Sequence, residues 1–203
     1  MALPVQCYSS PVFDLRILLF ILALLIGAAS GLAMTWVMSA RDNGFGALDI
    51  GSWRAWPRSG TFEADPYARA SFARSGELPI GLSEGITFVA TTDDNGRTLN
   101  GRCVTRLSGL LLPARFWTIT IYDGRGRLIE NLAGRYGYTS VEAFYNARGE
   151  IDILLAPRAQ SGNWIPTGES ERIVAVIRLY DTPTGVARGE AAQMPRITRE
   201  RCP

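Results

Sequence analysis

The feature that most limits how this chain can fold is a long apolar run near its N-terminus. From Ile17 to Ala40, 24 consecutive residues carry no charge. About 20 apolar residues span the hydrocarbon core of a bilayer as a helix. Trp36 lies near the C-terminal end of the run, where an amphipathic ring suits the membrane interface. The run therefore predicts a transmembrane helix over residues 15–40.

Three interpretations of this run compete: a retained signal-anchor helix, a cleaved signal peptide and a buried core helix. The run exceeds the roughly 7–15 apolar residues of a signal-peptide core. Only Gly31-Leu32-Ala33 weakly resembles a cleavage site. A soluble helix of this length normally has a polar face, and this run has none. The retained signal anchor is the favoured interpretation, with cleavage as its main competitor.

The distribution of arginines around the run, taken alone, favours a cytosolic location for the large domain. Only Arg16 and the α-amino group lie on the N-terminal side, whereas Arg41, Arg54 and Arg58 follow the run closely. The positive-inside rule is weaker for long translocated segments. We predict the opposite orientation, with residues 1–14 as a short cytosolic N-terminus, for reasons given below.

Two absences exclude most common enzyme mechanisms. The chain has 21 basic residues, all of them arginine, and no histidine. Without histidine there is no Ser-His-Asp or Cys-His nucleophile and no imidazole metal ligand. Without lysine there is no P-loop and no Schiff base. A net charge of +2 does not indicate a nucleic-acid-binding protein. Asp, Glu, Tyr, Cys and Arg remain as candidates for chemistry.

The segment after the membrane helix is predicted to be a linker followed by a short helix. Residues 41–63 are rich in glycine and have no hydrophobic period, so they predict a linker. Trp53 and Trp56 within it either sit at the membrane surface or cover the first edge of the folded domain. Asp65 suits a helix N-cap and the following proline suits the first helical position, so a helix is expected over residues 65–76.

The remainder predicts short β-strands separated by turns. Asn95-Gly96 is the strongest hairpin signal, and the preceding Asp93-Asp94 lacks the spacing of a calcium loop. Alternation in residues 115–123 predicts a strand with Trp117, Ile119 and Ile121 on one face. The expected strands are 86–91, 102–107, 115–123, 128–132, 151–156 and 172–180. Their spacing favours a mainly β domain, either a β-sandwich or a barrel.

Several long motifs resemble a bacterial family called domain of unknown function 1214. They are ADPYARA (64–70), LPIGLSEGITFVATTDDNGRTLNG (78–101), ARFWTITIYDGRGRLI (114–129), GNWIPTG (162–168) and RLYDTP (178–183). The resemblance covers roughly residues 48–200. It implies a jelly-roll-like antiparallel β-sandwich exported to the periplasm, with no established activity. Members often follow a sister domain of unknown function 1254, and this sequence resembles the single-domain, membrane-anchored form.

Two cysteines give a further reason to place the domain outside the cytosol. Cys7 precedes the membrane helix and is expected to be cytosolic and free. Cys103 and Cys202 lie in the domain, and two cysteines in an exported domain predict one disulfide. The alternative is two unrelated cysteines, one buried and one on a frayed tail.

The candidate ligand-binding residues fall into two groups. Residues 162–168 predict a loop in which Asn163 accompanies Trp164, whose flat face suits a sugar ring or a lipid chain. The alternative for Trp164 is a plug at one end of the sandwich. Arg115, Tyr67 and Tyr122 predict a polar-aromatic pocket in which the guanidinium binds a carboxylate or phosphate. The alternative for Arg115 is an ordinary ion pair.

Glu84 completes the candidate ligand-binding residues, because it lies near a predicted strand end, as do Asp123 and Asp181. A catalytic pair among these three carboxylates requires a geometry that spacing alone does not give. No catalytic residue, metal ligand or cofactor is predicted.

The sequence therefore predicts a single-pass protein of the bacterial inner membrane, with residues 64–203 as a periplasmic β-sandwich. The expected function is non-catalytic binding of an envelope component or a partner protein. One alternative is a structural envelope or assembly protein without a small ligand. The other is a His-independent hydrolase or lyase that uses carboxylates. The expected contacts are the lipid bilayer, through the helix, and an envelope ligand or protein, with no nucleic acid.

Overall fold

The structure is a computed structural model that describes residues 11–40, 46–75, 78–183 and 193–203. The chain divides into two units, residues 1–42 and 43–203, and each is described by itself. The N-terminal segment that contains Cys7 lies outside the described residues.

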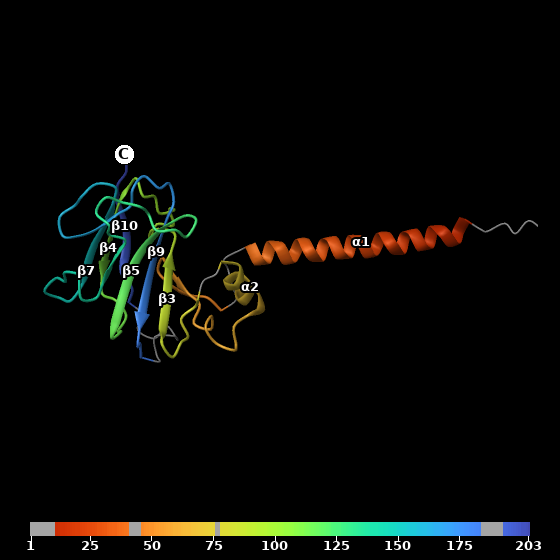
Figure 1. Ribbon diagram of the computed structural model, residues 1–203, viewed down its shortest axis with the longest axis horizontal. Helices are drawn as coiled ribbons and strands as arrows, with labels where there is room; N and C mark the ends of the chain where they lie inside the picture. Colours follow the sequence, from red (N-terminus) through yellow and green to blue (C-terminus); the bar gives the residue numbers. More distant parts are fainter. Residues whose placement is uncertain (1–10, 41–45, 76–77, 184–192) are drawn as a thin grey trace, which may run out of the picture. The chain divides into compact units, whose positions relative to one another are not determined.

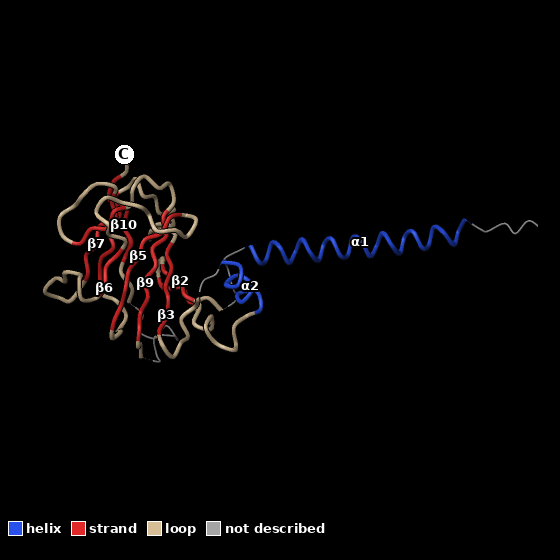
Figure 2. Tube along the Cα trace, viewed as in Figure 1, coloured by secondary structure: helices blue, strands red, loops and turns tan. Residues whose placement is uncertain are grey.

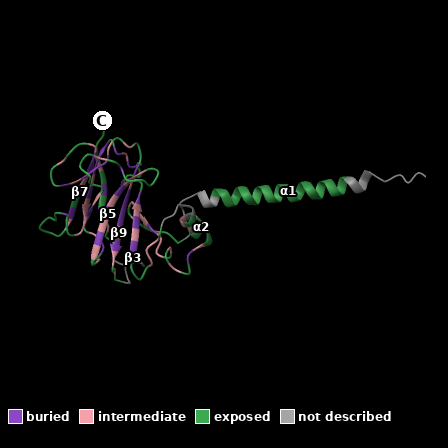
Figure 3. Cartoon of the chain, in the orientation of Figure 1, coloured by how far each residue is buried: buried purple, intermediate pink, exposed green. Residues whose placement is uncertain are grey.

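Helix α1 (Pro11–Ala40) forms the first unit (Figure 1). Within it, Leu15–Val37 is long and apolar enough to cross a membrane, and none of this window is buried. The described side chains of α1 are exposed along its length (Figure 3). The hydroxyl groups of Ser30 and Thr35 donate to carbonyl groups of the preceding helical turn, at 3.0 and 2.9 Å. Intrahelical bonds of this kind satisfy polar groups where lipid offers no partner.

Two β-sheets, packed face to face, form most of the second unit (Figure 2). The six-stranded sheet has the order β1-β2-β3-β9-β5-β6 and the four-stranded sheet has the order β10-β4-β7-β8. The strands are β1 (Leu48–Ile50), β2 (Trp53–Ala55), β3 (Gly85–Ala90), β4 (Val104–Gly109), β5 (Phe116–Asp123), β6 (Gly137–Thr139), β7 (Ile151–Ala156), β8 (Asn163–Pro166), β9 (Ile173–Tyr180) and β10 (Arg196–Arg201). The predicted β-sandwich is confirmed.

Strand β5 shows how alternation in the sequence builds the core. Trp117, Ile119 and Ile121 are buried between the sheets, as their spacing predicts, while the residues between them face outward. Phe88 from β3 and Leu107 from β4 are fully buried in the same cluster. Every strand pair is antiparallel except β7 and β8, which are parallel. The four-stranded sheet is therefore mixed rather than purely antiparallel.

Four turns share one short pattern, with Asp or Asn first, Gly fourth and Arg or Glu fifth. They are 93–97 (DDNGR), 123–127 (DGRGR), 131–135 (NLAGR) and 146–150 (NARGE). In each turn, a side-chain oxygen of the first residue accepts a hydrogen bond from the backbone N–H of the fifth. The four glycines have φ between 60 and 77°, a region that favours glycine. These local signals fix the points at which the chain reverses.

The helix that the capping residues predict is α2 (Pro66–Ser75). The carboxylate of Asp65 accepts a hydrogen bond of 3.3 Å from the backbone N–H of Tyr67, which is the predicted N-cap role. Gly76, the residue expected to end this helix, lies outside the described residues.

The structure differs from the predicted strand pattern in three places. Residues 128–132 form no strand, and only Leu128 makes an isolated bridge, to Tyr122. The stretch 41–63, expected to be a linker, contains both β1 and β2, so the sheet begins earlier than predicted. Residues 162–168, expected to be a loop, contain strand β8. In each case tertiary pairing, rather than local propensity, decides the structure.

Gly137 in β6 lies where no side chain fits, and replacing it by alanine is expected to destabilise the sandwich. A Cβ atom at this position would lie 1.9 Å from the carbonyl oxygen of Ile119 on the paired strand. Relief requires the two strands to move apart, so we expect a loss of about 2–3 kcal/mol in the free energy of unfolding. Urea unfolding followed by tryptophan fluorescence measures this loss.

Gly149→Asn is the control for Gly137→Ala. Gly149 has open space around it and φ of 75°, which asparagine tolerates. Equal losses in the two variants would contradict the steric explanation.

Candidate functional site

Asn163 holds a loop in place. Its side chain is buried, and its amide nitrogen donates to the carbonyl oxygens of Phe144 and Asp152 at 2.8 and 3.0 Å. Its amide oxygen accepts from the backbone N–H of Phe144 at 2.8 Å. The two bonds to Phe144 tie the chain after β6 to the edge strand β8, and the third joins β8 to Asp152 on β7. The structure therefore gives Asn163 a structural role, and its ligand-binding role stays a prediction.

Trp164 is half-buried on β8 rather than displayed on a loop. Its indole N–H donates to the carbonyl oxygen of Ala156 at 3.0 Å. Its backbone N–H donates to the hydroxyl group of Tyr138 at 3.2 Å, and its carbonyl oxygen accepts from Arg135 at 3.3 Å. The side chains of Tyr138 and Arg135 thus bond to the backbone of Trp164 at the free edge of β8. Covering an edge strand is one way in which proteins block its pairing with another chain.

The other candidate residues do not form one pocket. Arg115 is exposed and lies 3.7 Å from Asp181 in an ion pair, which is the alternative that the sequence left open. The backbone carbonyl of Glu84 accepts from Asp181 at 2.8 Å, so these three residues share one end of the six-stranded sheet. Tyr122 lies near the opposite end of β5, where Arg178 stacks 5.9 Å from its ring centre.

Tyr67 is exposed on α2 and so comes from a different element than Arg115 and Tyr122. The predicted polar-aromatic pocket of Arg115, Tyr67 and Tyr122 is therefore not assembled among the described residues. The ends of one long strand hold Arg115 and Tyr122 apart.

A groove that the sequence did not predict lies between the two sheets, beside β1, β2 and the start of β10. We call it the β1/β10 groove, and its volume is about 740 Å³. Volumes of this size are typical of small-molecule sites. The lining residues come from five stretches of the chain: Ile50–Trp53, Thr92–Asp94 with Gly96, Ser108–Leu110, Glu150 and Gln193–Arg196.

Trp53 and Asp94 fix the shape of the groove. The indole N–H of Trp53, which is 1% exposed, donates to the carbonyl oxygen of Pro195 at 2.7 Å and joins β2 to the chain leading into β10. The carboxylate of Asp94 accepts from the hydroxyl group of Ser52 at 2.7 Å and pairs with Arg196 at 3.4 Å. Arg196 is 80% exposed, so this ion pair is open to exchange with a ligand.

Asp93 lines the groove, and its buried side chain is a charged anchor. Its side chain is fully buried and pairs with Arg97 at 2.8 Å and with Arg199 at 3.8 Å. Burial alone would raise the pKa of this carboxyl group. Hydrogen bonds from the backbone N–H and guanidinium of Arg97 and from the backbone N–H of Asn95 outweigh burial, so the pKa is lowered. Asp93 is therefore ionised at neutral pH and supports the turn.

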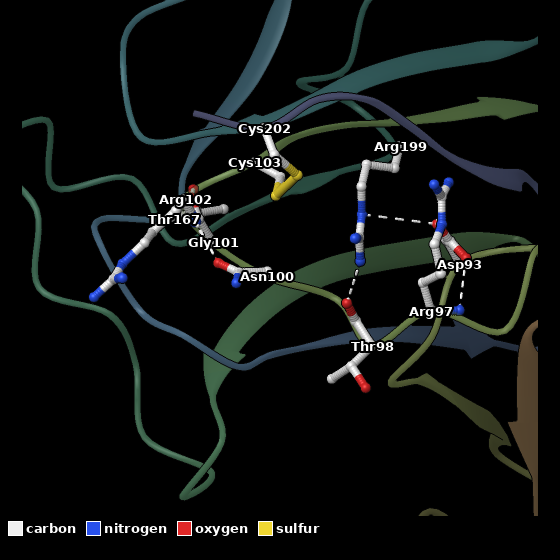
Figure 4. Close-up of a disulfide and its surroundings, with 10 residues drawn as sticks. All are labelled: Asp93, Arg97, Thr98, Asn100, Gly101, Arg102, Cys103, Thr167, Arg199 and Cys202. Carbon is white, nitrogen blue, oxygen red and sulfur yellow. Dashed lines mark hydrogen bonds and ion pairs between the residues drawn. A yellow bond between two sulfur atoms is a disulfide. The ribbon is translucent and has the colours of Figure 1, made fainter.

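A disulfide joins Cys103 to Cys202 close to this anchor (Figure 4). Cys103 is buried just before β4, and Cys202 directly follows β10. Arg199 donates to the carbonyl oxygen of Thr98 as well as pairing with Asp93, so β10 is tied to the preceding hairpin at several points. The strand whose start lines the groove is thus held by a covalent bond at its other end.

The groove offers polar and apolar groups but no assembled catalytic set in the described residues. Of the carboxyl groups with a resolved shift, both Asp93 and Asp123 have a lowered pKa. At Asp123 the backbone N–H of Arg127 is the main cause. No group of three or more Asp, Glu or Cys side chains among the described residues is placed to hold a metal ion.

Sequence reasoning missed this site because its walls come from distant segments. Two signals were present, Trp53 in a stretch without hydrophobic period and the Asp93-Asp94 pair in a hairpin turn. Neither signal shows which residue it contacts. Trp53 contacts Pro195 and Asp94 contacts Arg196, and each partner lies about 100 or more residues away. Long-range pairing of this kind is not visible in local patterns.

A solved structure shares the fold of this chain. The VPA0106 protein from Vibrio parahaemolyticus superposes with a TM-score of 0.59 at 18% identity, over 98% of this chain and 48% of that protein. This chain therefore spans about half the length of that protein. A putative uncharacterized protein from Burkholderia cenocepacia is similar at 15% identity, over 61% of this chain and 32% of that one, with a TM-score of 0.40.

A search of curated proteins finds no match to the chain. The resemblance noted in the sequence is nevertheless confirmed by a family model. Residues 84–184 match the model of the family described as "Protein of unknown function (DUF1214)".

Proposed function

We propose that this protein is a membrane-anchored binding module whose β-sandwich receives an envelope component or a partner protein in the β1/β10 groove. Helix α1 anchors it in the bacterial inner membrane, and the domain lies in the periplasm. The groove carries the proposal, because its volume of about 740 Å³ lies within the range of ligand sites. The disulfide supports the periplasmic placement, because such bonds persist in oxidising compartments.

The chemistry of the groove favours a ligand with both an apolar part and polar groups. Ile50, Leu110 and Met194 supply apolar contacts. Asp94 and Arg196 present an exposed ion pair beside them, which can exchange for hydrogen bonds to a ligand. Concave sites that combine apolar walls with a few polar groups bind small molecules or short segments of chain. The proposal assigns no catalysis, and the lowered pKa of Asp93 supports an anchoring role rather than acid catalysis.

A second candidate function is assembly in the envelope without a small ligand. Leu132, Val141 and Phe144 support it, because these apolar side chains are at least 74% exposed. They lie in the chain on either side of β6, away from the residues that line the groove. Exposed apolar side chains often mark surfaces that meet another protein.

Native mass spectrometry of the full chain, released from nanodiscs after gentle purification, tests the groove. We expect a small molecule or peptide to be retained by the wild-type protein and released on denaturation. Leu110→Asp should abolish this mass, because it places a charge on the groove wall next to Asp94 and Glu150. Leu110 is 41% exposed, so the variant is expected to fold, which its thermal unfolding checks.

Leu128→Asp is the matched control, because Leu128 is 48% exposed and does not line the groove. It should retain the ligand. Retention of the ligand by both variants, or a wild-type monomer without bound ligand, would contradict the groove as the ligand site. A bare oligomer that Leu132→Asp dissociates would favour the assembly role instead.

A further inference from the structure

The segment between β2 and β3 carries apolar side chains that the described part of the domain leaves wholly or partly exposed. Phe62 is 101% exposed and Leu78 is 92% exposed, while Leu82 and Tyr67 are 38% and 39% exposed. We call these four residues the Phe62 patch. We propose that the Phe62 patch docks the domain onto the headgroup layer of the membrane that α1 spans. This inference rests on the proposed membrane anchor and is independent of the groove.

The two stretches of chain that carry the patch are held together. Their backbones touch at Gly60 and Gly81, where a Cβ atom on Gly60 would lie 2.6 Å from the Cα atom of Gly81. The side chain of Arg69, on α2, donates to the carbonyl oxygen of Phe62 and so ties this loop to the helix. Phe62 and Leu82 therefore project from adjoining loops of one small substructure rather than from separate tails.

Helix α2 contributes Tyr67 to the patch and carries two arginines. It has no acidic residue of its own, but Glu63, Asp65, Glu77 and Glu84 flank it, so docking depends on the apolar side chains rather than on attraction to anionic lipids. Tyr67 and Ala70 are exposed, and Ala68 and Phe72 are only partly buried. Of these four carboxylates, Asp65 is used as the N-cap of the helix. Aromatic and apolar side chains beside arginine are typical of interfacial segments.

The length of the chain between the two units keeps the domain near the bilayer. Ala40 ends α1 and Leu48 begins β1, so the connection measures at most roughly 30 Å even when fully extended. A domain of this size is itself roughly 40 Å across. Strand β2 leads directly into the segment that bears the Phe62 patch. Because the tether is shorter than the domain, an apolar surface close to its entry point meets the headgroups repeatedly.

Site-specific fluorescence quenching tests the docking. The full chain with Cys7→Ser leaves no free cysteine, because Cys103 and Cys202 are joined. An environment-sensitive NBD label is then placed at Phe62→Cys, at Leu78→Cys in a second sample, and at Phe144→Cys as the control. Phe144 is 74% exposed and lies outside the patch. The protein is reconstituted into vesicles of phosphatidylethanolamine and phosphatidylglycerol that contain doxyl-labelled lipids.

We expect the labels at positions 62 and 78 to shift to shorter wavelength and to lose most of their emission to doxyl groups placed high on the acyl chain. The label at position 144 should stay unquenched. A blue shift without quenching would show that protein covers the patch, and equal quenching at all three positions would show no preferred face. Either result overturns the proposal. A chain that fails to float with the vesicles would instead contradict the membrane anchor itself.

Discussion

Replacing Cys103 and Cys202 together by alanine is expected to lower the free energy of unfolding of the sandwich by about 4–5 kcal/mol. The disulfide links positions separated by 99 residues, so its removal frees a very long loop in the unfolded chain. Alanine is the suitable replacement, because Cys103 is buried and a serine hydroxyl group there would lack a partner. Urea unfolding of the full chain in detergent, followed by tryptophan fluorescence, measures the loss.

Cys7→Ser is the control and should leave the urea midpoint unchanged. A reductant should shift the wild-type midpoint toward that of the double variant and leave the double variant unaffected. A loss of less than about 1 kcal/mol in the free energy of unfolding of the double variant would contradict a stabilising role of the disulfide. Thiol trapping in intact cells extends the test to location, because a domain in the periplasm should hold this pair oxidised and a cytosolic domain should hold it reduced.

Asp93→Ala is expected to cost about 3 kcal/mol of stability, because it breaks a buried ion pair. The substitution leaves Arg199, whose side chain is 19% exposed, without the carboxylate that it faces. It also removes the acceptor for the backbone N–H groups of Asn95 and Arg97. Asp93→Asn restores an acceptor for these N–H groups but not the charge, so its loss should be smaller. The same urea titration measures both variants.

Asp123→Ala is the matched control, because Asp123 begins a turn of the same pattern and pairs with Arg127 in the same way. Its carboxylate is partly exposed rather than fully buried, so water replaces the lost contacts and the loss should be clearly smaller. Equal losses at Asp93 and Asp123 would show that the turn, rather than the buried charge, supplies the stability.

The same carboxylate predicts how stability varies with pH. The folded state lowers the pKa of Asp93 below its ordinary value of 3.8. Its contribution is therefore fully present above that pH and is lost as the pH falls through the lower, folded value. Urea midpoints of the wild-type protein should fall between pH 5 and the acid range below about pH 4. Asp93→Ala should show a shallower fall, and an unchanged pH profile would contradict the assignment.

Features set by neighbouring residues were predictable from the sequence. The alternation around Trp117 gave the inner face of β5, and Asp65 marked the start of α2. The turn at Asn95-Gly96 was likewise a local signal. In each case the interacting residues lie within a few positions of one another, so a local sequence pattern is enough to predict the feature.

Features set by distant partners were not predictable. Strand β10 reads RITRER and has one buried apolar residue, Ile197, so it shows no alternation that marks a strand. It exists because β4 pairs with it and because the disulfide holds its end. Strand β8 was mistaken for a binding loop because glycines flank it, although β7 pairs with it in parallel. The groove beside Trp53 combines five stretches that only the folded sandwich brings together.

The covalent link between Cys103 and Cys202 also determines how the domain responds to mechanical force. If α1 holds one end and a load pulls at Pro203, the force passes from Cys202 through the sulfur atoms to Cys103 and bypasses the residues between them. Only residues 43–103 can then be drawn out, roughly 200 Å of extended chain, instead of roughly 550 Å for the whole domain. Residues 104–201, from β4 to β10, lie outside the path of the force and cannot be extended while the disulfide is intact, although the loss of β1 to β3 removes part of the core that they share.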